Sequence, residues 1–399
     1  MLSRFWWPVG TSLGVILLIL MTDILLSEAE EGFTLTVSCP PGFEHTADNR
    51  CLLRSLYQQY AAPKGFGGLR APLPDVRDGF SPQEIDLGRY LFFDPVLSGD
   101  QAKSCASCHQ PDKGFADGLG RSIGKDGKVL ARGAPSLWNV AFLKRLFWDG
   151  RAASLEEQAA GPLLSPDEMA ATPEGVEERL NGNAAYRRLF VEVYPETASA
   201  GISFVDVTRA IVAFEASLVS LNSRYDRYAH GDQSALDEKE IAGHNIFRSF
   251  VTRCSQCHTP PLFTSDELAV IGSPEPEGVN FDPGAEIPEG NPAMRGAFKV
   301  PGLRNIALTA PYMHSGRFGT LKEVIEFYNK GRGNAVPPGE QLNIHWHITD
   351  FNLSAEEVDA LVAFLATLTD ESMMPEIPVR VPSGLPVTEM RTHQSGERP

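Results

Sequence analysis

The chain has 399 residues, of which 42% are hydrophobic and 22% are charged, which is an ordinary composition for a globular protein. This length suggests two or three domains. The formal net charge of −16 makes nucleic acid and anionic membrane surfaces poor partners, so no nucleic-acid function is expected.

The N-terminus carries one early Arg4 and then an apolar stretch that is interrupted by Asp23. Ser27 and Ala29 have the spacing of a signal-peptide cleavage site. We interpret residues 1–29 as an export signal, with an uncleaved membrane anchor as the alternative. Both interpretations place the rest of the chain outside the cytoplasm, in the periplasm.

The segment 30–65 contains the first of three cysteine pairs, Cys39 and Cys51, in the loop CPPGFEHTADNRC. This loop is rich in Pro, Gly and Asp, and an exported chain folds in an oxidising compartment. The pair therefore predicts a small disulfide-closed loop that has no catalytic role.

The other two cysteine pairs lie in short motifs, CASCH at 105–109 and CSQCH at 254–258. Such motifs are typical of c-type haem attachment, in which both cysteines form thioethers and the histidine binds the iron. A thioredoxin-like redox pair or half of a zinc site would not explain a histidine directly after both pairs. The sequence predicts two covalent haems with His109 and His258 as axial ligands. The predicted attachment residues are Cys105, Cys108, Cys254 and Cys257.

The sequence before each motif also repeats, in segments 81–109 and 236–258. Each segment carries a Glu-Ile helix start, an amphipathic turn or two, and then the haem motif. This pattern is typical of a cytochrome c-like helical domain that occurs twice. Further helices are expected at 204–221 and 354–368, whereas the alternation typical of strands is scarce. The predicted fold class is mainly α.

We place the first cytochrome c-like domain, with the peroxidatic haem, at 66–222. The second domain, with the electron-transfer haem, is placed at 223–371. The proline-rich tail 372–399 is expected to lie outside both cores and to be partly disordered.

The sixth coordination position of each iron separates an electron carrier from an enzyme, because a closed iron cannot bind peroxide. None of the nine histidines lies between His109 and His230, and the loop 122–139 has no methionine. Lys125 is a conceivable ligand in this loop, but a lysine between glycines is expected to be solvated. The first haem is therefore expected to be open on one side.

A helix is expected to start near Leu321, because Thr320 and Glu323 have the spacing of a capping box. Helical periodicity puts four of its side chains on one face: Leu321, Val324, Ile325 and Tyr328. Tyr328 then points inward. A lone inward tyrosine is ordinarily a core residue, and this remains the alternative to a functional role.

The order of motifs identifies a family. CASCH is followed by FWDGRA, by Gln-x9-Glu-Met, by CSQCH and by LRNIALTAPYMHSG. This order resembles that of the bacterial di-haem cytochrome c peroxidase and MauG superfamily over roughly residues 66–370. The resemblance implies two covalent haem c groups and hydrogen peroxide as a substrate.

Carried over onto this chain, Trp148 matches the tryptophan between the two haems, and Gln158 and Glu168 match the polar pair over the open haem. Pro162 matches a proline that lines the same pocket. A carboxylate beside an open iron can move a proton between the peroxide oxygens, and an amide can orient the peroxide. The alternatives are a helix-start carboxylate for Glu168 and a core residue for Trp148.

The chain departs from the family pattern at two positions. Classical peroxidases carry a gating histidine near the place of Lys125, so the resemblance implies that this reductive gate is absent. The family also binds calcium through an asparagine side chain and two carbonyls. Thr309 and Pro311 match the carbonyl donors, but Gly133 stands in place of the asparagine, which puts calcium in doubt.

The family also implies a role for Tyr328. Fourteen residues after the histidine of the PY-x-H motif, here His314, peroxidases carry a methionine that binds the second iron and MauG-like enzymes carry tyrosine. Oxygen ligation favours ferric and more oxidised iron. Tyr328 is therefore the predicted ligand, with Met294, Met313 and His314 as competing candidates.

The predicted function is that of a MauG-like enzyme, for which the resemblance implies a bis-Fe(IV) state and oxidation of tryptophan in a periplasmic partner protein. The segment 39–57 inclines this prediction towards a copper-linked partner of methanobactin clusters. One alternative is a cytochrome c peroxidase that takes electrons from a small cytochrome or copper protein. The other is a di-haem electron carrier without catalysis.

Overall fold

The computed structural model describes residues 32–61, 72–331, 334, 336–370 and 372–387. The predicted export signal or anchor at 1–29 lies outside these residues. Within the described ranges, no helix is long and apolar enough to cross a membrane.

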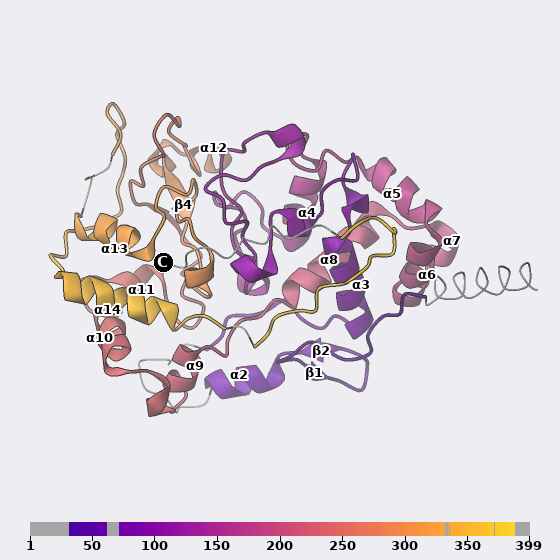
Figure 1. Ribbon diagram of the computed structural model, residues 1–399, viewed down its shortest axis with the longest axis horizontal. Helices are drawn as coiled ribbons and strands as arrows, with labels where there is room; N and C mark the ends of the chain where they lie inside the picture. The colour runs from indigo at the N-terminus through magenta and orange to yellow at the C-terminus, as the bar shows by residue number, and fades with distance from the viewer. Residues whose placement is uncertain (1–31, 62–71, 332–333, 335, 371, 388–399) are drawn as a thin grey trace, which may run out of the picture.

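The described chain is mainly helical, as predicted, with two small antiparallel pairs of strands (Figure 1). The helices are α2 (Arg54–Ala61), α3 (Pro82–Phe93), α4 (Leu155–Leu164), α5 (Pro173–Gly182), α6 (Ala184–Val193), α7 (Thr197–Ala200), α8 (Phe204–Ala216), α9 (Arg224–Ala229), α10 (Glu238–Phe247), α11 (Cys254–Cys257), α12 (Glu286–Glu289), α13 (Leu321–Asn329) and α14 (Ala355–Ala366). The strands are β1 (Glu44–His45), β2 (Cys51–Leu52), β3 (Leu268–Val270) and β4 (Ala297–Lys299).

Each half of the molecule is built on one crossed pair of helices, α3 with α8 and α10 with α14 (Figure 1). A Cβ added to Gly88 of α3 would lie 1.8 Å from the carbonyl oxygen of Ala210, and one added to Gly243 of α10 would lie 1.9 Å from that of Ala360. Both glycines are therefore required for the close approach of two helices. The repeat predicted from the sequence is confirmed, because each half contains one pair of helices that pack closely through a glycine.

The helix expected at 204–221 ends earlier, at Ala216. Ser217 donates a side-chain hydrogen bond back to the Phe214 carbonyl, and the next residues turn towards Asn139. The Asn139 amide N–H donates to the Leu218 carbonyl over 2.8 Å. This contact with a distant loop ends the helix.

A second repeated unit follows each haem motif. A tight loop closes with a bridge between Leu146 and Ala152 in the first half, and the same loop closes between Tyr312 and Phe318 in the second. A helix follows each loop: Ser154 caps α4, and Thr320 caps α13 with the predicted capping box. The two loops and helices are thus counterparts of each other, which allows their residues to be compared position by position.

The N-terminal segment holds the two halves together along one edge of the molecule (Figure 1). The predicted disulfide between Cys39 and Cys51 is present and closes the β1–β2 hairpin. Helix α2 then reaches the second half, where the Tyr60 hydroxyl donates to Asp226 over 2.8 Å. Asp226 is itself in a buried ion pair with Arg304.

The described part of the tail, 372–387, runs back along the first half instead of standing apart from the cores. Val381 is 1% exposed and belongs to the first hydrophobic core. The Ser383 hydroxyl donates to Asp94 over 2.7 Å.

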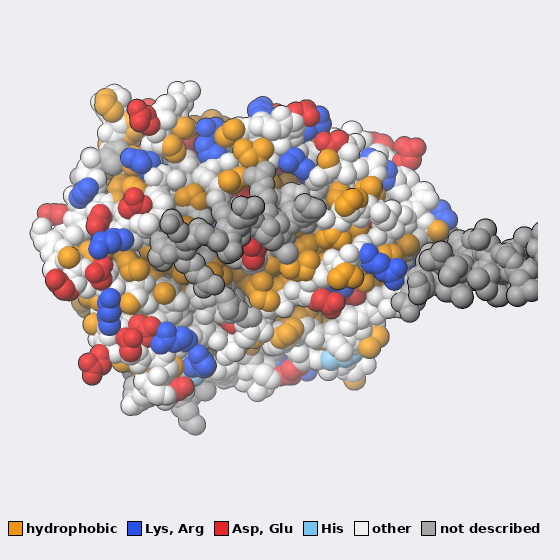
Figure 2. Space-filling view, viewed as in Figure 1, with side chains coloured by type: hydrophobic (Ala, Val, Ile, Leu, Met, Phe, Trp, Pro, Cys, Tyr) orange, Lys and Arg blue, Asp and Glu red, His pale blue; other side chains and the backbone are white. Residues whose placement is uncertain are grey.

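Hydrophobic side chains gather along the middle of the face drawn in Figure 2, whereas acidic and basic ones are scattered towards its edges.

Candidate functional site

The first haem motif lies on a single 3₁₀ turn, Cys105–Ser107, and leaves both cysteines free of disulfides. His109 Nδ1 lies 2.8 Å from the carbonyl oxygen of Phe115. Phe115 has φ +60°, an uncommon backbone conformation for a bulky residue, and it turns this carbonyl towards the ring. When Nδ1 donates here, Nε2 is left without its proton and can bind a metal.

The second motif is arranged in the same way on α11. His258 Nδ1 lies 3.2 Å from the carbonyl oxygen of Phe263 and 3.0 Å from that of Pro301, and Phe263 has φ +57°. Burial lowers the pKa of both His109 and His258, which keeps each imidazole in the neutral form that binds iron. Both motifs therefore fit the attachment and proximal ligation of a haem.

A cavity of about 980 Å³ opens beside the first motif. Its lining brings together all the residues that the sequence assigned to this site: Cys105, Cys108, His109, Trp148, Gln158, Pro162 and Glu168. Lys125 is not among the lining residues; its ammonium pairs with Asp126 over 2.7 Å at the surface. The prediction that Lys125 is solvated is confirmed.

Glu168 is not a helix-start carboxylate, so that alternative is wrong. It lies in the turn between α4 and α5, where its backbone N–H donates to the Ser165 carbonyl. Burial raises the pKa of its carboxyl, and Asp167 adds to this rise while Arg151 opposes it. A carboxyl with a raised pKa that lines a cavity is well suited to exchange a proton there.

The two halves differ in the side chain that one equivalent helical position places beside each haem motif. Pro162 lies eight residues after the Ser154 cap of α4, and Tyr328 lies eight residues after the Thr320 cap of α13. The same helical position thus carries a proline, which has no ligand atom, beside the first motif and a phenol beside the second.

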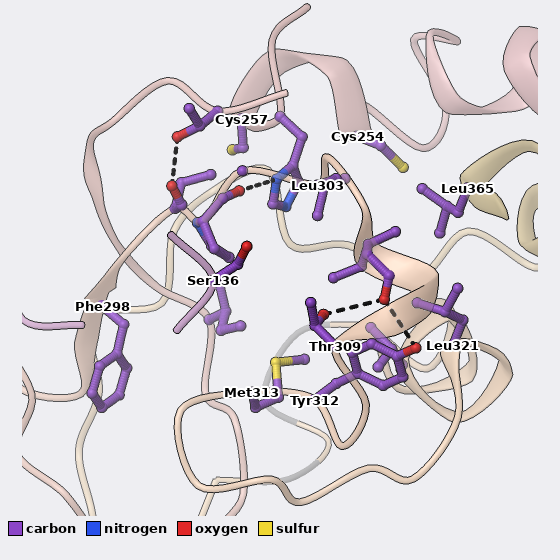
Figure 3. A pocket seen from close by; sticks show the side chains of 18 of the residues that line it. Ser136, Cys254, Cys257, Phe298, Leu303, Thr309, Tyr312, Met313, Leu321 and Leu365 are labelled. Carbon is purple, nitrogen blue, oxygen red and sulfur yellow. Dashed lines mark hydrogen bonds between the residues drawn. The ribbon is translucent and has the colours of Figure 1, made fainter. Parts of the chain in front are cut away.

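The second cavity, of about 270 Å³, is lined by Cys254, Cys257, His258 and Tyr328. Figure 3 shows the two cysteines at its edge. Burial raises the pKa of Tyr328, and the nearby thiols raise it further, so the phenol is neutral in the absence of a metal. Tyr328 also packs against the small cluster of Val270 and Ile344. It is therefore both a packed residue and a cavity residue.

The structure distinguishes the three residues that compete with Tyr328 as the ligand at the second site. Met294 does not line the second cavity. His314 lines it, but His314 Nε2 lies 2.8 Å from the carboxylate of Glu275 and its ring stacks on Phe298 with centroids 3.8 Å apart. Met313 lines the cavity with its thioether and remains a candidate beside Tyr328 (Figure 3).

Trp148 lines both cavities, which places it at the junction of the two sites. Its indole N–H donates to the Gly133 carbonyl over 2.8 Å. The backbone at this junction is shared between the halves: the Gly133 amide donates to the His314 carbonyl over 2.8 Å, and the Lys299 amide donates to the Trp148 carbonyl over 2.7 Å. A core residue alone would not be expected to face two cavities.

The residues predicted for calcium do not make a complete site. Thr309 and Pro311 line the second cavity. Gly133 contributes no side-chain oxygen, and a Cβ at this position would lie only 2.9 Å from the Gly120 carbonyl oxygen. Calcium takes six to eight oxygen ligands, among which water can stand. Calcium at Thr309 and Pro311 therefore stays a prediction, without the side-chain oxygen that the family has in place of Gly133.

Sequence reasoning missed two charged groups at these cavities, Glu215, which is buried, and Lys299, which is half-buried. Glu215 of α8 is 4% exposed, lines the first cavity and has one oxygen without a partner, and burial raises its pKa to about 8. A single acid in the apolar run AIVAFEASLV could have signalled it. Lys299 of β4 lines both cavities, and no local pattern marks it.

Comparisons with known proteins agree with this geometry. A family model described as di-haem cytochrome c peroxidase matches residues 82–234. The chain is 37% identical to the methylamine utilization protein MauG of Methylorubrum extorquens, over 75% of this chain and 82% of that protein. It is 36% identical to the cytochrome c551 peroxidase of Nitrosomonas europaea, over 81% of this chain and 91% of that protein.

Solved structures give the same result. A MauG-like protein associated with microbial copper homeostasis is 34% identical, with a TM-score of 0.70, over 78% of this chain and 97% of that protein. The di-haem peroxidase BthA of Burkholderia thailandensis is 30% identical, with a TM-score of 0.62, over 80% of this chain and 92% of that protein.

Proposed function

Because the chain belongs to the di-haem cytochrome c peroxidase and MauG family of haem-dependent oxidoreductases, we propose that it reduces hydrogen peroxide at the His109 site. The oxidising equivalents then pass through Trp148 to the His258 site and are used to oxidise an aromatic residue of a partner protein. One observation carries this proposal: the two sites are otherwise similar, but the helical position that is Pro162 in the first half is Tyr328 in the second half.

Both haems are proposed to be covalently attached through the four cysteines of the motifs, none of which is in a disulfide. Bound haem iron supplies the redox chemistry, and the chain supplies the axial ligands and the environment. Pro162 leaves room for peroxide beside the first iron. Gln158 orients the peroxide by hydrogen bonding, and Glu168 moves a proton from the near oxygen to the far oxygen.

Tyr328 would hold the second haem iron through its phenol oxygen, together with His258. Its phenol loses a proton when it binds, which the metal's positive charge favours against the raised pKa. Oxygen ligation favours the more oxidised states of iron, so the second site stores oxidising equivalents and is a poor acceptor of electrons from a high-potential donor.

Atoms and electrons balance with an aromatic partner as the reductant. Each peroxide takes up two electrons and two protons and leaves as two molecules of water. The partner's aromatic side chain loses two electrons and two protons in the same turnover. We place the enzyme and this partner in the periplasm, because the predicted export signal precedes cysteines of which one pair is an observed disulfide.

A surface beside the second site is suited to contact such a partner. Phe250 is 86% exposed, and Trp346 is 61% exposed with the Arg253 guanidinium 5.2 Å from its ring centroid. Arg253 also lines the second cavity. Exposed aromatic and arginine side chains are typical of interface centres. On a chain with a net charge of −16, this local cation favours a partner with acidic groups.

The second candidate function is a cytochrome c peroxidase that detoxifies peroxide with electrons from a small cytochrome or copper protein. Relatives named cytochrome c551 peroxidase favour it. Stopped-flow mixing of the fully ferric protein with peroxide separates the two. Reaction without prior reduction supports the MauG-like function, whereas a requirement for a half-reduced protein supports the peroxidase.

Electron paramagnetic resonance of the resting ferric protein tests the remaining alternative. A high-spin signal from the first haem is expected, because Pro162, which has no ligand atom, stands at the helical position that Tyr328 holds beside the second motif. Two low-spin signals without a high-spin signal would instead indicate a di-haem electron carrier.

A further inference from the structure

The junction between the two cavities contains a cation without a partner. Among the described residues, Lys299 is the one lysine or arginine that lines both cavities. Its backbone is fixed there by the 2.7 Å hydrogen bond to the Trp148 carbonyl and by pairing of β4 with β3. Its side-chain ammonium forms no hydrogen bond or ion pair with any described residue.

The neighbouring charges do not neutralise Lys299. Asp266 is the carboxylate that acts on it electrostatically, but no hydrogen bond or ion pair joins the two: Oδ2 of Asp266 accepts the backbone N–H groups of Lys144 and Arg145 over 2.6 and 3.2 Å, and its Oδ1 has no partner among the described residues. Desolvation lowers the pKa of Lys299 in spite of Asp266. A partly desolvated ammonium without an ion pair is stabilised when an anion comes close to it.

The other cation at the junction is already paired. Arg132 lines the first cavity and bonds to Asp149 over 2.8 Å and to Asp282 over 2.7 Å. Lys299 also has no basic counterpart in the other half. The hydrogen bond from Lys299 to Trp148 is mirrored by the one from Gly133 to His314, so the first half carries a glycine where the second carries the lysine.

The missing anion belongs to the groups that fill the cavities. In a c-type haem, the thioethers form at the vinyl groups, and the propionate carboxylates lie at the opposite edge. Figure 3 shows Phe298, the residue before Lys299, across the second cavity from Cys254. Lys299 follows Phe298 in β4 and lines both cavities, so its ammonium can meet a propionate carboxylate at either site.

We propose that Lys299 is a positioning residue that serves as the shared counter-ion for propionate carboxylates of both haems. Through this single cation the two sites share one electrostatic environment beside Trp148. The inference rests on the presence of two haems and is independent of which substrate the enzyme oxidises.

The test is a spectroelectrochemical titration of both haems in Lys299→Met, with haem content measured by the pyridine haemochrome assay. Loss of the positive charge is expected to lower both midpoint potentials, because a nearby cation favours the reduced iron. Lys299→Arg keeps the charge and should leave both potentials near those of the wild type. Lys322→Met, which removes a surface lysine paired with Asp359, is the matched control and should change neither potential.

A shift at one haem only, or at neither, overturns the proposal. Resonance Raman spectra of the Arg variant provide a second readout that does not depend on the Met variant assembling. Exchange of an ammonium for a guanidinium should shift the propionate bands of both haems, and unchanged bands overturn the proposal as well. A wild-type protein that carries fewer than two haems would instead contradict the proposed function itself.

Discussion

Tyr328→Phe separates a ligand from a packed side chain, because it removes one oxygen and keeps the ring. Among the described residues, the phenol oxygen has no hydrogen-bond partner, and the ring packs against Val270 and Ile344. The net loss for a typical hydrogen bond is about 1 kcal/mol, so this substitution should reduce the free energy of unfolding of the haem-free chain by less than that. The absorbance spectrum and potential of the second haem should nevertheless change.

Tyr312→Phe is the matched control in the same cavity. The Tyr312 hydroxyl donates to the Ile306 carbonyl over 3.2 Å, so its removal should reduce the free energy of unfolding by about 0.5–1.5 kcal/mol and leave the second haem's spectrum unchanged. The two variants are thus expected to show opposite patterns of stability and spectrum. Met313→Leu tests the competing ligand and should also leave the spectrum unchanged.

The measurements are denaturant unfolding, the ferric absorbance spectrum and a redox titration of the second haem. Tyr328→Phe should also abolish oxidation of the partner protein, while peroxide still reacts at the first haem. Tyr328→Met should raise the second haem's potential, because a thioether ligand favours ferrous iron. If Tyr328→Phe leaves the spectrum and potential of the second haem untouched, Tyr328 is a core residue and the MauG-like proposal loses its main support.

Three further substitutions test other parts of the structure. Glu168→Gln should slow the reaction with peroxide in stopped-flow mixing by about 10²–10⁴-fold, whereas exposed Glu174→Gln should not, and equal rates would deny Glu168 a role in proton transfer. Trp148→Phe should slow electron exchange between the haems in rapid-mixing spectra, and an unchanged rate would show that the electrons follow another route. Asp226→Asn leaves the buried Arg304 charge unpaired and should reduce the free energy of unfolding by about 3–5 kcal/mol, while a loss below about 1 kcal/mol would contradict this buried pair. Burial would raise the pKa of Asp226, but Arg304 outweighs it and lowers that pKa, so this stability is present above the unfolded pKa of about 3.9 and is lost as the pH falls through the lower folded pKa.

Local spacing made the haem motifs, the disulfide loop and several helix starts predictable. The cysteines and histidine of each motif lie within five residues, so one turn brings them together whatever surrounds it. The capping box of Thr320 and Glu323 is equally local and was found as predicted. Family resemblance added Trp148 and Glu168, which the residues alone would have left as a core side chain and a helix-start acid.

Only the tertiary structure decided which of these groups face the same space. Glu168 reaches the first cavity because the chain turns between α4 and α5, whereas Met294 ends the 3₁₀ turn Pro292–Met294 and does not line the second cavity. The pKa values of Glu215 and Lys299 are shifted because elements far away in the chain cover these side chains. The surroundings of a charge determine its solvation and therefore its pKa. Spacing in the sequence fixes contacts within a turn, but desolvation is a property of the whole packed molecule.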